Sequence, residues 1–445
     1  MHKLYVGYSQ INITPEVFGP MGGHGNDEIR ICTEVCDPVY GSCIAISDED
    51  GSTVLLCPCD IINTPDSLTV PAKQALSEAT GVPFDNIFLC ASHNHHGPSI
   101  SAPHLEAVQA YYRYFIKQMT KAALKALEDR KPATLQIGHN TVPAMTFVRH
   151  YIMNDGTVCG VHSGNTESGY KAHLTESDDQ LQLMRFVRQE GRDVLLVNWQ
   201  SHVTIGVDPK VRTILTADYP GVMRNCVESS LDCHCAFFQG AAGNLVPVSK
   251  IEGEAQVPHE RVAYGTRLAE YVLEGIKNLS NVSTGPIQVT KQTYTGAIDH
   301  AEDHLVPNAK EVVAHYYDDA YANGGRLAYC RSMGFNSIHH ARHVITRAGM
   351  GESMSMDLSA ISIGDVSFIT APFEMFNSNG RFIKGNSPFN MTFICTCTNG
   401  GHSYLADCTT FNYDTYEVNS RRMGAGTAEA VADTYVSMLN TLKQK

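Results

Sequence analysis

Apolar and polar residues alternate along the chain in a pattern that predicts strands and helices in turn. Residues 52–60 and 84–92 are mostly apolar runs of strand length, and residues 69–79 between them have the periodicity of a helix. A longer helical pattern follows over residues 105–128, where aromatic and aliphatic residues recur on one face. We expect that face to pack in the core.

The same alternation continues further along the chain. Residues 193–200 predict a strand, residues 236–244 a strand that enters a glycine-rich turn, and residues 261–279 a long helix. This order predicts an α/β fold with mixed β-sheets and flanking helices. We expect residues 1–445 to form a single domain, with a possible sub-boundary near residues 278–286, a stretch rich in serine, asparagine and glycine.

Composition and charge narrow the range of partners. Hydrophobic residues make up 43% of the 445 residues and charged residues 18%, which is typical of a folded globular protein. The formal net charge of -13 argues against a nucleic-acid partner, because binding to phosphate backbones needs clustered lysine and arginine. The amino-terminal residues soon turn polar, and no window reaches the roughly 18 apolar residues of a membrane span. We therefore expect a soluble, cytoplasmic protein without membrane insertion; its oligomeric state is unknown from the sequence.

Fourteen cysteines include three closely spaced pairs. Each pair stands in an apolar run, and a Cys-x-Cys spacing in a strand places both side chains on one face. No pair is matched to a second pair at a zinc-finger spacing. We interpret the pairs as buried free thiols rather than a sulfur metal site. The pairs are Cys57/Cys59, Cys233/Cys235 and Cys395/Cys397.

A cluster of histidines follows the strand predicted at residues 84–92. Side chains two apart in extended backbone point the same way, so His93 and His95 are expected to face one pocket and His96 the other side. His202 similarly follows the strand at residues 193–200. Imidazole is a common zinc ligand, so these residues indicate either a metal site or a loop in which histidines cap backbone groups.

Five segments are spread in order over most of the chain. They are Ala-Ser-His-Asn-His-His-Gly-Pro at 91–98, Asn-Trp-Gln-Ser-His at 198–202, Phe-Gln-Gly-Ala-Ala-Gly-Asn at 238–244, Pro-Phe-Glu at 372–374 and Tyr-Glu at 416–417. Together, and in this order, they resemble the neutral (non-lysosomal) ceramidase family. The resemblance implies that zinc is bound by His93, His202, Glu374 and Tyr416. Two imidazoles and an anionic oxygen suit zinc, which can lower the pKa of a bound water to near neutral.

The resemblance also implies roles for residues around the metal. His95 becomes the general base or proton carrier, because a histidine beside a metal titrates in the working range. Arg149 is expected to hold the substrate or its oxyanion. Asp60, at the end of the strand before the cluster, is a candidate to orient a ligand imidazole.

The sequence departs from the family at three places. Gly240 stands where ceramidases carry a serine, although a metal-activated water is sufficient for hydrolysis. His24 stands near a position where the family tends to have an aromatic residue, so we expect it, with Gln239 and Gly240, to contact the substrate. Arg421 and Arg422 follow Tyr416 where ceramidases place a further tyrosine. They either bind an anionic or polar substrate or are solvated.

The resulting hypothesis is a zinc-dependent hydrolase that cleaves an amide bond of a small soluble N-acyl substrate. The sequence shows neither the carboxyl-terminal β-rich domain nor the export signal of secreted ceramidases, so we expect a smaller substrate than membrane ceramide. Two alternatives stay open. The same metal can serve the hydrolysis of an ester, lactone or glycoside, or the chain is a binding protein that has lost catalysis.

Overall fold

Two β-sheets that pack face to face form the centre of the computed structural model, which describes residues 2–24, 30–160, 166–321 and 325–444. The first sheet has the strand order β14-β12-β11-β6-β1-β3-β4-β5, and β16 pairs with β6. Its strands are β1 (Leu4–Asn12), β3 (Tyr40–Asp48), β4 (Thr53–Cys59), β5 (Ile87–Ala91), β6 (Lys131–Thr141), β11 (Gln180–Arg188), β12 (Asp193–Trp199), β14 (Cys233–Gln239) and β16 (Ser280–Asn281). The second sheet has the order β17-β18-β19-β21. Its strands are β17 (Ile287–Ala297), β18 (Ser353–Ile363), β19 (Val366–Thr370) and β21 (Met391–Cys395).

The inner faces of the two sheets share one hydrophobic core. Phe238 of the first sheet lies against Phe393 of the second, with ring centroids 6.4 Å apart, and Phe368 lies 5.3 Å from Phe393. The segment at residues 278–286 carries the chain from one sheet to the other, because β16 pairs with β6 before β17 begins. We propose that the chain forms one domain with no boundary at this segment.

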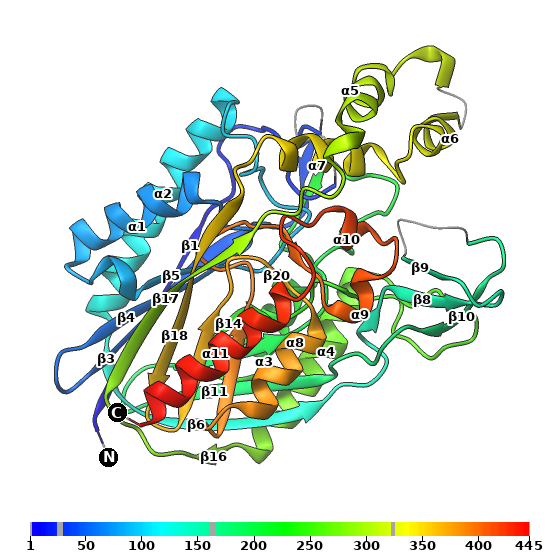
Figure 1. Ribbon diagram of the computed structural model, residues 1–445. Coiled ribbons are helices and arrows are strands. Elements are labelled where there is room, and N and C mark those ends of the chain that lie inside the picture. Colours follow the sequence, from blue (N-terminus) through cyan, green and yellow to red (C-terminus); the bar gives the residue numbers. More distant parts are fainter. Residues whose placement is uncertain (1, 25–29, 161–165, 322–324, 445) are drawn as a thin grey trace.

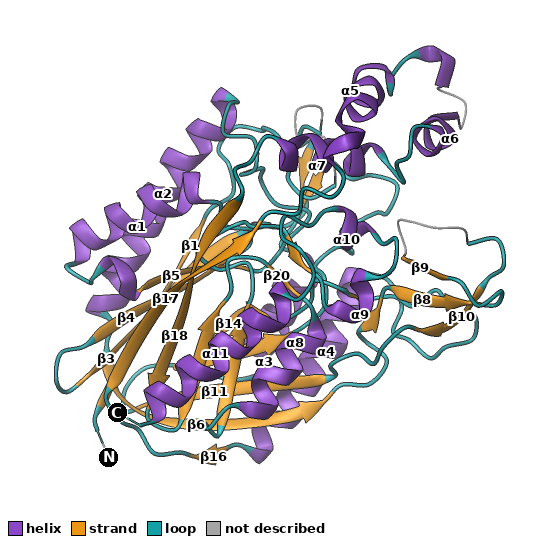
Figure 2. Cartoon of the chain, in the orientation of Figure 1, coloured by secondary structure: helices purple, strands orange, loops and turns teal. Residues whose placement is uncertain are grey.

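Helices cover the outer faces of both sheets (Figures 1 and 2). On the first sheet, α1 (Asp66–Thr80) and α2 (Glu106–Glu128) cover the end at β3 to β5, while α3 (Asp218–Ser230) and α4 (Arg261–Gly275) cover the end at β12 and β14. On the second sheet, α8 (Asn377–Asn386) and α11 (Thr427–Lys443) cover the outer face. The predicted α/β fold with mixed sheets and flanking helices is confirmed.

Burial on both faces explains why the strands could be recognised from the sequence. In β12, Leu196 faces the core between the sheets, whereas Leu195 and Val197 face the helices. A strand covered on both faces is a continuous apolar run. The predicted strands at 52–60 and 193–200 therefore match β4 and β12 within one residue at each end.

Other element boundaries differ from the prediction for local reasons. The strand at 84–92 is shortened because residues Phe84–Asn86 form a 3-10 turn before β5. Helix α1 begins at Asp66, three residues before the predicted start, and α2 begins at Glu106. Helix α4 ends at Gly275 and continues as a 3-10 turn over Ile276–Asn278.

An insertion between β17 and β18 was not predicted. It contains α5 (Val306–His315), α6 (Gly325–Ser332) and α7 (Ile338–Ala348), which share a small hydrophobic core of their own. In Figure 1, α5 and α6 project from the body of the molecule while α7 lies near α10 (Tyr416–Asn419). Among the described helices, none combines the length and the hydrophobicity needed to cross a membrane.

The cysteines are free, and the three pairs are buried as predicted. Cys57 and Cys59 lie in the same hydrophobic cluster, on one side of β4. Cys395 and Cys397 do not share a face, so this part of the prediction is wrong. The reason is that β21 ends at Cys395 and Cys397 adopts a left-handed backbone with φ of 53°.

Candidate metal centre

Three pairs of parallel strands point their carboxyl ends at one region of the molecule. The pairs are β4 with β5, β12 with β14, and β19 with β21. His93 follows β5, His202 follows β12, and Glu374 follows β19 as the first residue of β20 (Glu374–Met375). In α/β sheets this end of the strands is where ligands are usually bound.

The side chains of His93, His202 and Glu374 converge at this edge. The Oε2 atom of Glu374 lies 3.2 Å from Nε2 of His93 and 3.4 Å from Nε2 of His202. The two imidazole rings are nearly perpendicular, with centroids 4.6 Å apart. Both histidines are buried.

Backbone carbonyls fix the tautomer of both histidines. Nδ1 of His93 lies 2.9 Å from the carbonyl oxygen of Ile62, and Nδ1 of His202 lies 2.7 Å from that of Ala242. A carbonyl only accepts, so each Nδ1 donates and each Nε2 keeps its lone pair in the neutral ring. This is the arrangement that orients metal-binding histidines in proteins.

His95 joins the same cluster. Its Nε2 lies 3.1 Å from Nε2 of His93, and with His202 the three residues offer ligand atoms within 4.8 Å of one another. The sequence prediction explained the shared direction of His93 and His95 by an extended backbone. That explanation is wrong, because His93 has a φ of 62° and does not lie in extended backbone. The loop is held by a hydrogen bond from the amide of His95 to the carbonyl of Val203, 3.0 Å long. His95 is therefore placed to act either as a metal ligand or as a proton carrier.

Burial and mutual charges set the protonation of the cluster. Burial would raise the pKa of Glu374, but His93 and His202 hold it well below its ordinary value. Burial, Arg149 and His93 lower the pKa of His202 to about 4. Burial and the surrounding histidines also lower the pKa of His95 well below its ordinary value. The site therefore holds an anionic oxygen beside imidazoles of which two are neutral.

Arg149 lies beside the cluster and is held by a buried carboxylate. Its Nε lies 2.5 Å from Oε1 of Glu417, whose Oε2 lies 2.6 Å from Nε2 of His150. Nη2 of Arg149 donates to the carbonyl of Gly243 and to the hydroxyl of Tyr404, at 2.8 and 3.2 Å. Within the described residues Nη1 donates to no protein group, so it is available to a ligand. The sequence prediction found Arg149 but gave Tyr404, Glu417 and His150 no role.

Tyr416 begins α10 and lies at the edge of the cluster. Its ring centroid is 5.8 Å from that of Tyr404, and burial together with the charge of Glu374 raises its pKa. The neighbouring residue on this short helix is Glu417. Helix α10 therefore brings both the predicted tyrosine ligand and the partner of Arg149 to the site.

The glycine-rich turn supports the site through its backbone. A Cβ atom on Gly243 would lie 2.8 Å from the carbonyl oxygen of Glu374, so only glycine permits this approach. Gln239 is buried and donates to the carbonyl of Ser201 at 3.1 Å. A Cβ on Gly240 would lie 2.8 Å from Oε1 of Gln200. Substrate contact by Gln239 and Gly240 stays a prediction.

His24 and His96 complete the histidine-rich surroundings. The ring of His24 lies 5.2 Å from that of His95 and 4.9 Å from that of His96. His96 is buried, with Nδ1 3.3 Å from Oδ2 of Asp218. His24 thus lies near the candidate proton carrier, while His96 turns to Asp218 and away from Glu374.

Two sequence interpretations of charged residues are wrong. Asp60 does not orient a ligand imidazole, because its carboxylate receives two hydrogen bonds from Arg224, at 2.8 and 2.7 Å. Arg421 is not solvated. It is buried, and its Nε lies 2.5 Å from Oδ2 of Asp299.

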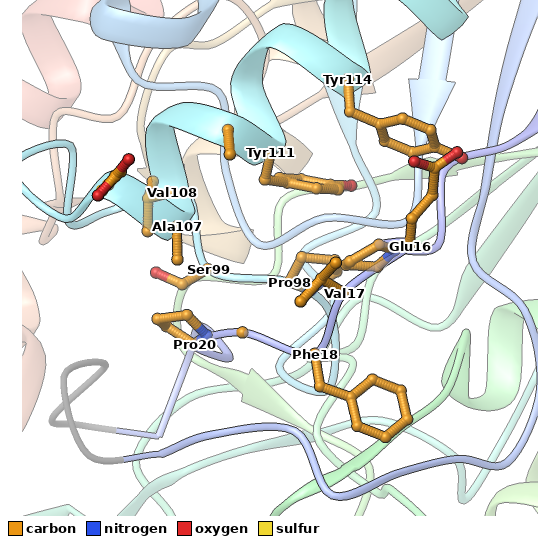
Figure 3. A pocket seen from close by; sticks show the side chains of 14 residues that line it. Glu16, Val17, Phe18, Pro20, Pro98, Ser99, Ala107, Val108, Tyr111 and Tyr114 are labelled. Atoms are coloured by element: carbon orange, nitrogen blue, oxygen red, sulfur yellow. The ribbon is translucent and has the colours of Figure 1, made fainter.

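A cavity of about 460 Å³ lies beside Pro98 and Ser99, which follow the histidines in the sequence (Figure 3). It opens between residues 15–20 and α2, with Phe18, Tyr111 and Tyr114 on its walls. It shares only Pro98 with the segment 91–98, and none of the predicted site residues lines it. The cavity therefore does not define the metal site.

The architecture is that of solved ceramidase structures. The whole chain superposes on three quarters of the crystal structure of neutral ceramidase from Pseudomonas aeruginosa, with a TM-score of 0.75 and 16% identity. It likewise covers 76% of a structure described as a ceramidase complexed with C2, with a TM-score of 0.72 and 14% identity. No protein-family model and no curated protein matches the sequence. The predicted ceramidase-like fold is confirmed.

The donor set fits a metal ion. Nε2 of His202 and Oε2 of Glu374 are buried without a hydrogen-bond partner among the described residues, although they lie 3.4 Å apart. Buried polar atoms rarely stay unsatisfied, so a cation between them would resolve the mismatch. Two imidazoles and a carboxylate are typical zinc ligands. Against the effect of burial, Glu374 raises the pKa of His93 well above its ordinary value, so a cation would compete with a proton for this ring.

Proposed function

We propose that this protein is a zinc-dependent amide hydrolase that acts on a small N-acyl amine. The observation that carries the proposal is the convergence of His93, His202 and Glu374, with both Nδ1 atoms held by backbone carbonyls. His93, His202 and Glu374 would hold the ion, with Tyr416 as fourth ligand. When bound, the ion would supply Lewis acidity and a water of lowered pKa.

Three groups of the chain would assist the reaction. His95 is 3.1 Å from His93 and would accept a proton from the attacking water and return it to the leaving amine. Nη1 of Arg149 donates to none of the described residues and would donate to the oxygen of the scissile carbonyl as negative charge develops there. Glu417 would fix the guanidinium of Arg149 in that orientation.

The ceramidase fold supports amide hydrolysis as the reaction class. Gly240 excludes a mechanism that needs a serine side chain in the turn. A metal-activated nucleophile does not need one.

Metal analysis of the purified protein tests the metal site. We expect about one zinc per chain in the wild type and loss of most of it in His93→Ala and His202→Ala. His139→Ala is the matched control, because no described side-chain contact involves that histidine on β6. Substoichiometric zinc in the wild type, unchanged in both site variants, would refute the proposal.

A panel of soluble amides, esters, lactones and glycosides tests the reaction class. Turnover confined to glycosides or esters would replace the amide assignment while keeping the metal. Full zinc occupancy without turnover of any compound would favour a binding protein.

A further inference from the structure

A cluster of unpaired cationic and imidazole side chains lies next to the metal site. They are Arg422 and three half-buried histidines, His339, His343 and His402. In the described part of the chain, none of these side chains forms a hydrogen bond or an ion pair with a carboxylate. We propose that this cluster binds an anionic group, such as a carboxylate, on the substrate. The proposal rests on the proposed amide hydrolysis and names its substrate class.

Helix α7 lies along the segment that carries Tyr416. His339 faces Tyr416, with ring centroids 6.4 Å apart. Two turns further, Nη1 of Arg347 donates to the carbonyl of Arg421 at 3.0 Å. His343 stands between them on the same helix face, because residues i, i+4 and i+8 align. The face of α7 therefore presents His339 and His343 to residues 416–422.

His402 reaches the same place from the other side. The next residue, Ser403, accepts a hydrogen bond from the amide of Glu374 at 2.9 Å and donates from its hydroxyl to the carbonyl of Ser420 at 2.6 Å. Residues 402–403 thus lie between the metal ligand Glu374 and the segment that ends in Arg422. The electrostatic influence of Arg422 on both His343 and His402 agrees with this placement.

The neighbouring arginines show how unusual Arg422 is. Arg421 pairs with Asp299, and Arg347 pairs with Glu302. Arg422 is half-buried, and burial lowers its pKa. Asp66 is the acidic group whose charge acts on it, although no hydrogen bond joins the two side chains. A buried charge without a partner is costly, so an anionic ligand is the natural complement.

The chemistry of the cluster suits an oxyanion. A guanidinium binds a carboxylate through two parallel hydrogen bonds, and neutral imidazoles add single donors. Because the cluster adjoins Tyr416 and Glu374, one substrate molecule could place its anionic group in the cluster and its amide at the metal. The substrate class is an N-acyl amine with a carboxylate or similar group on its acyl or amine part.

Matched substrate pairs test the proposal. N-acetylglycine and N-acetylglycinamide differ by a charge on the amine side, and N-methylsuccinamate and N-methylbutyramide by a charge on the acyl side. We expect the zinc-loaded wild type to prefer the anionic member of at least one pair by tenfold or more in kcat/KM. Arg422→Gln should reduce that preference at least tenfold while changing kcat/KM for the neutral member less than twofold, and Arg422→Lys should restore part of it.

The control is Arg267→Gln, an exposed arginine on α4 whose loss should leave the preference unchanged. A wild type without preference in either pair, or a preference that survives Arg422→Gln, would overturn the proposal. If no amide is cleaved, the proposed function fails, and calorimetry with N-acetylglycine and N-methylsuccinamate then tests the anion site alone. Binding of either that Arg422→Gln abolishes supports the site; binding of neither, or binding unchanged by the substitution, refutes it.

Discussion

Replacing Glu417 by glutamine would leave the charge of Arg149 buried without its partner. The carboxylate lies 2.5 Å from Nε of Arg149 and 2.6 Å from Nε2 of His150, and the three side chains are 1–5% exposed. Burial would raise the pKa of Glu417, yet Arg149 and His150 hold it well below its ordinary value. The pair is therefore ionised at neutral pH.

The expected loss of stability follows from this burial. Breaking a buried ion pair from one side costs about 3–5 kcal/mol. An unfolding entropy of about 2.1 cal/mol/K per residue gives about 0.9 kcal/mol/K for a chain of 445 residues. Glu417→Gln should thus lower Tm by about 3–5 °C.

A matched control separates burial from pairing. Arg267 and Glu270 lie 2.6 Å apart on α4, but their side chains are 48% and 55% exposed. An exposed pair contributes about 0–1 kcal/mol, so Glu270→Gln should shift Tm by at most about 1 °C. Both variants are compared by calorimetry at pH 7 and one scan rate, with chelator present. Equal shifts, or no shift for Glu417→Gln, would refute the argument.

Two further predictions concern local packing and acid stability. Gly240→Ser should destabilise the protein by about 1–3 kcal/mol in urea unfolding, because the added Cβ would lie 2.8 Å from Gln200. The substitution should not raise turnover, and an unchanged unfolding midpoint would contradict the prediction. The pKa of Glu302 falls from 4.5 to about 2 because, against the effect of burial, its cationic neighbours favour the carboxylate. Its folded pKa is depressed, so its contribution of about 2–3 kcal/mol is present above pH 4.5 and lost as the pH falls towards 2. The stability of Glu302→Gln, measured by acid unfolding, should lack that part of the pH dependence. A pH profile identical to that of the wild type would count against this prediction.

The strands and the first histidines could be predicted because their signals are local. Burial on both faces makes β4, β5 and β12 continuous apolar runs, and His93 and His202 stand just past two of their ends. Glu374 and Tyr416 lie in segments without such a pattern. They were found only through the resemblance to ceramidases.

Long-range contacts explain what could not be predicted. Glu417 meets His150 across 267 residues of sequence, and Arg149 meets Tyr404 across 255, so no spacing indicates either contact. Asp60 stands at a strand end beside the histidines, yet its partner Arg224 comes from α3, 164 residues away. The prediction placed Asp60 correctly and gave it the wrong partner.

The residues of the proposed metal site come from both sheets, so a bound ion would affect the stability of the fold. His93 and His202 follow strands of the first sheet, whereas Glu374 and Tyr416 belong to the part of the chain after β19 in the second. An ion held by both parts binds only while they are packed together, so it stabilises the folded chain by mass action, by about 4 kcal/mol when free zinc is 1,000 times Kd. With the entropy used above, chelation should lower Tm by about 4 °C. The decrease should be absent in His202→Ala, which calorimetry can establish, and a wild type whose Tm ignores chelator would show that no ion links the two sheets.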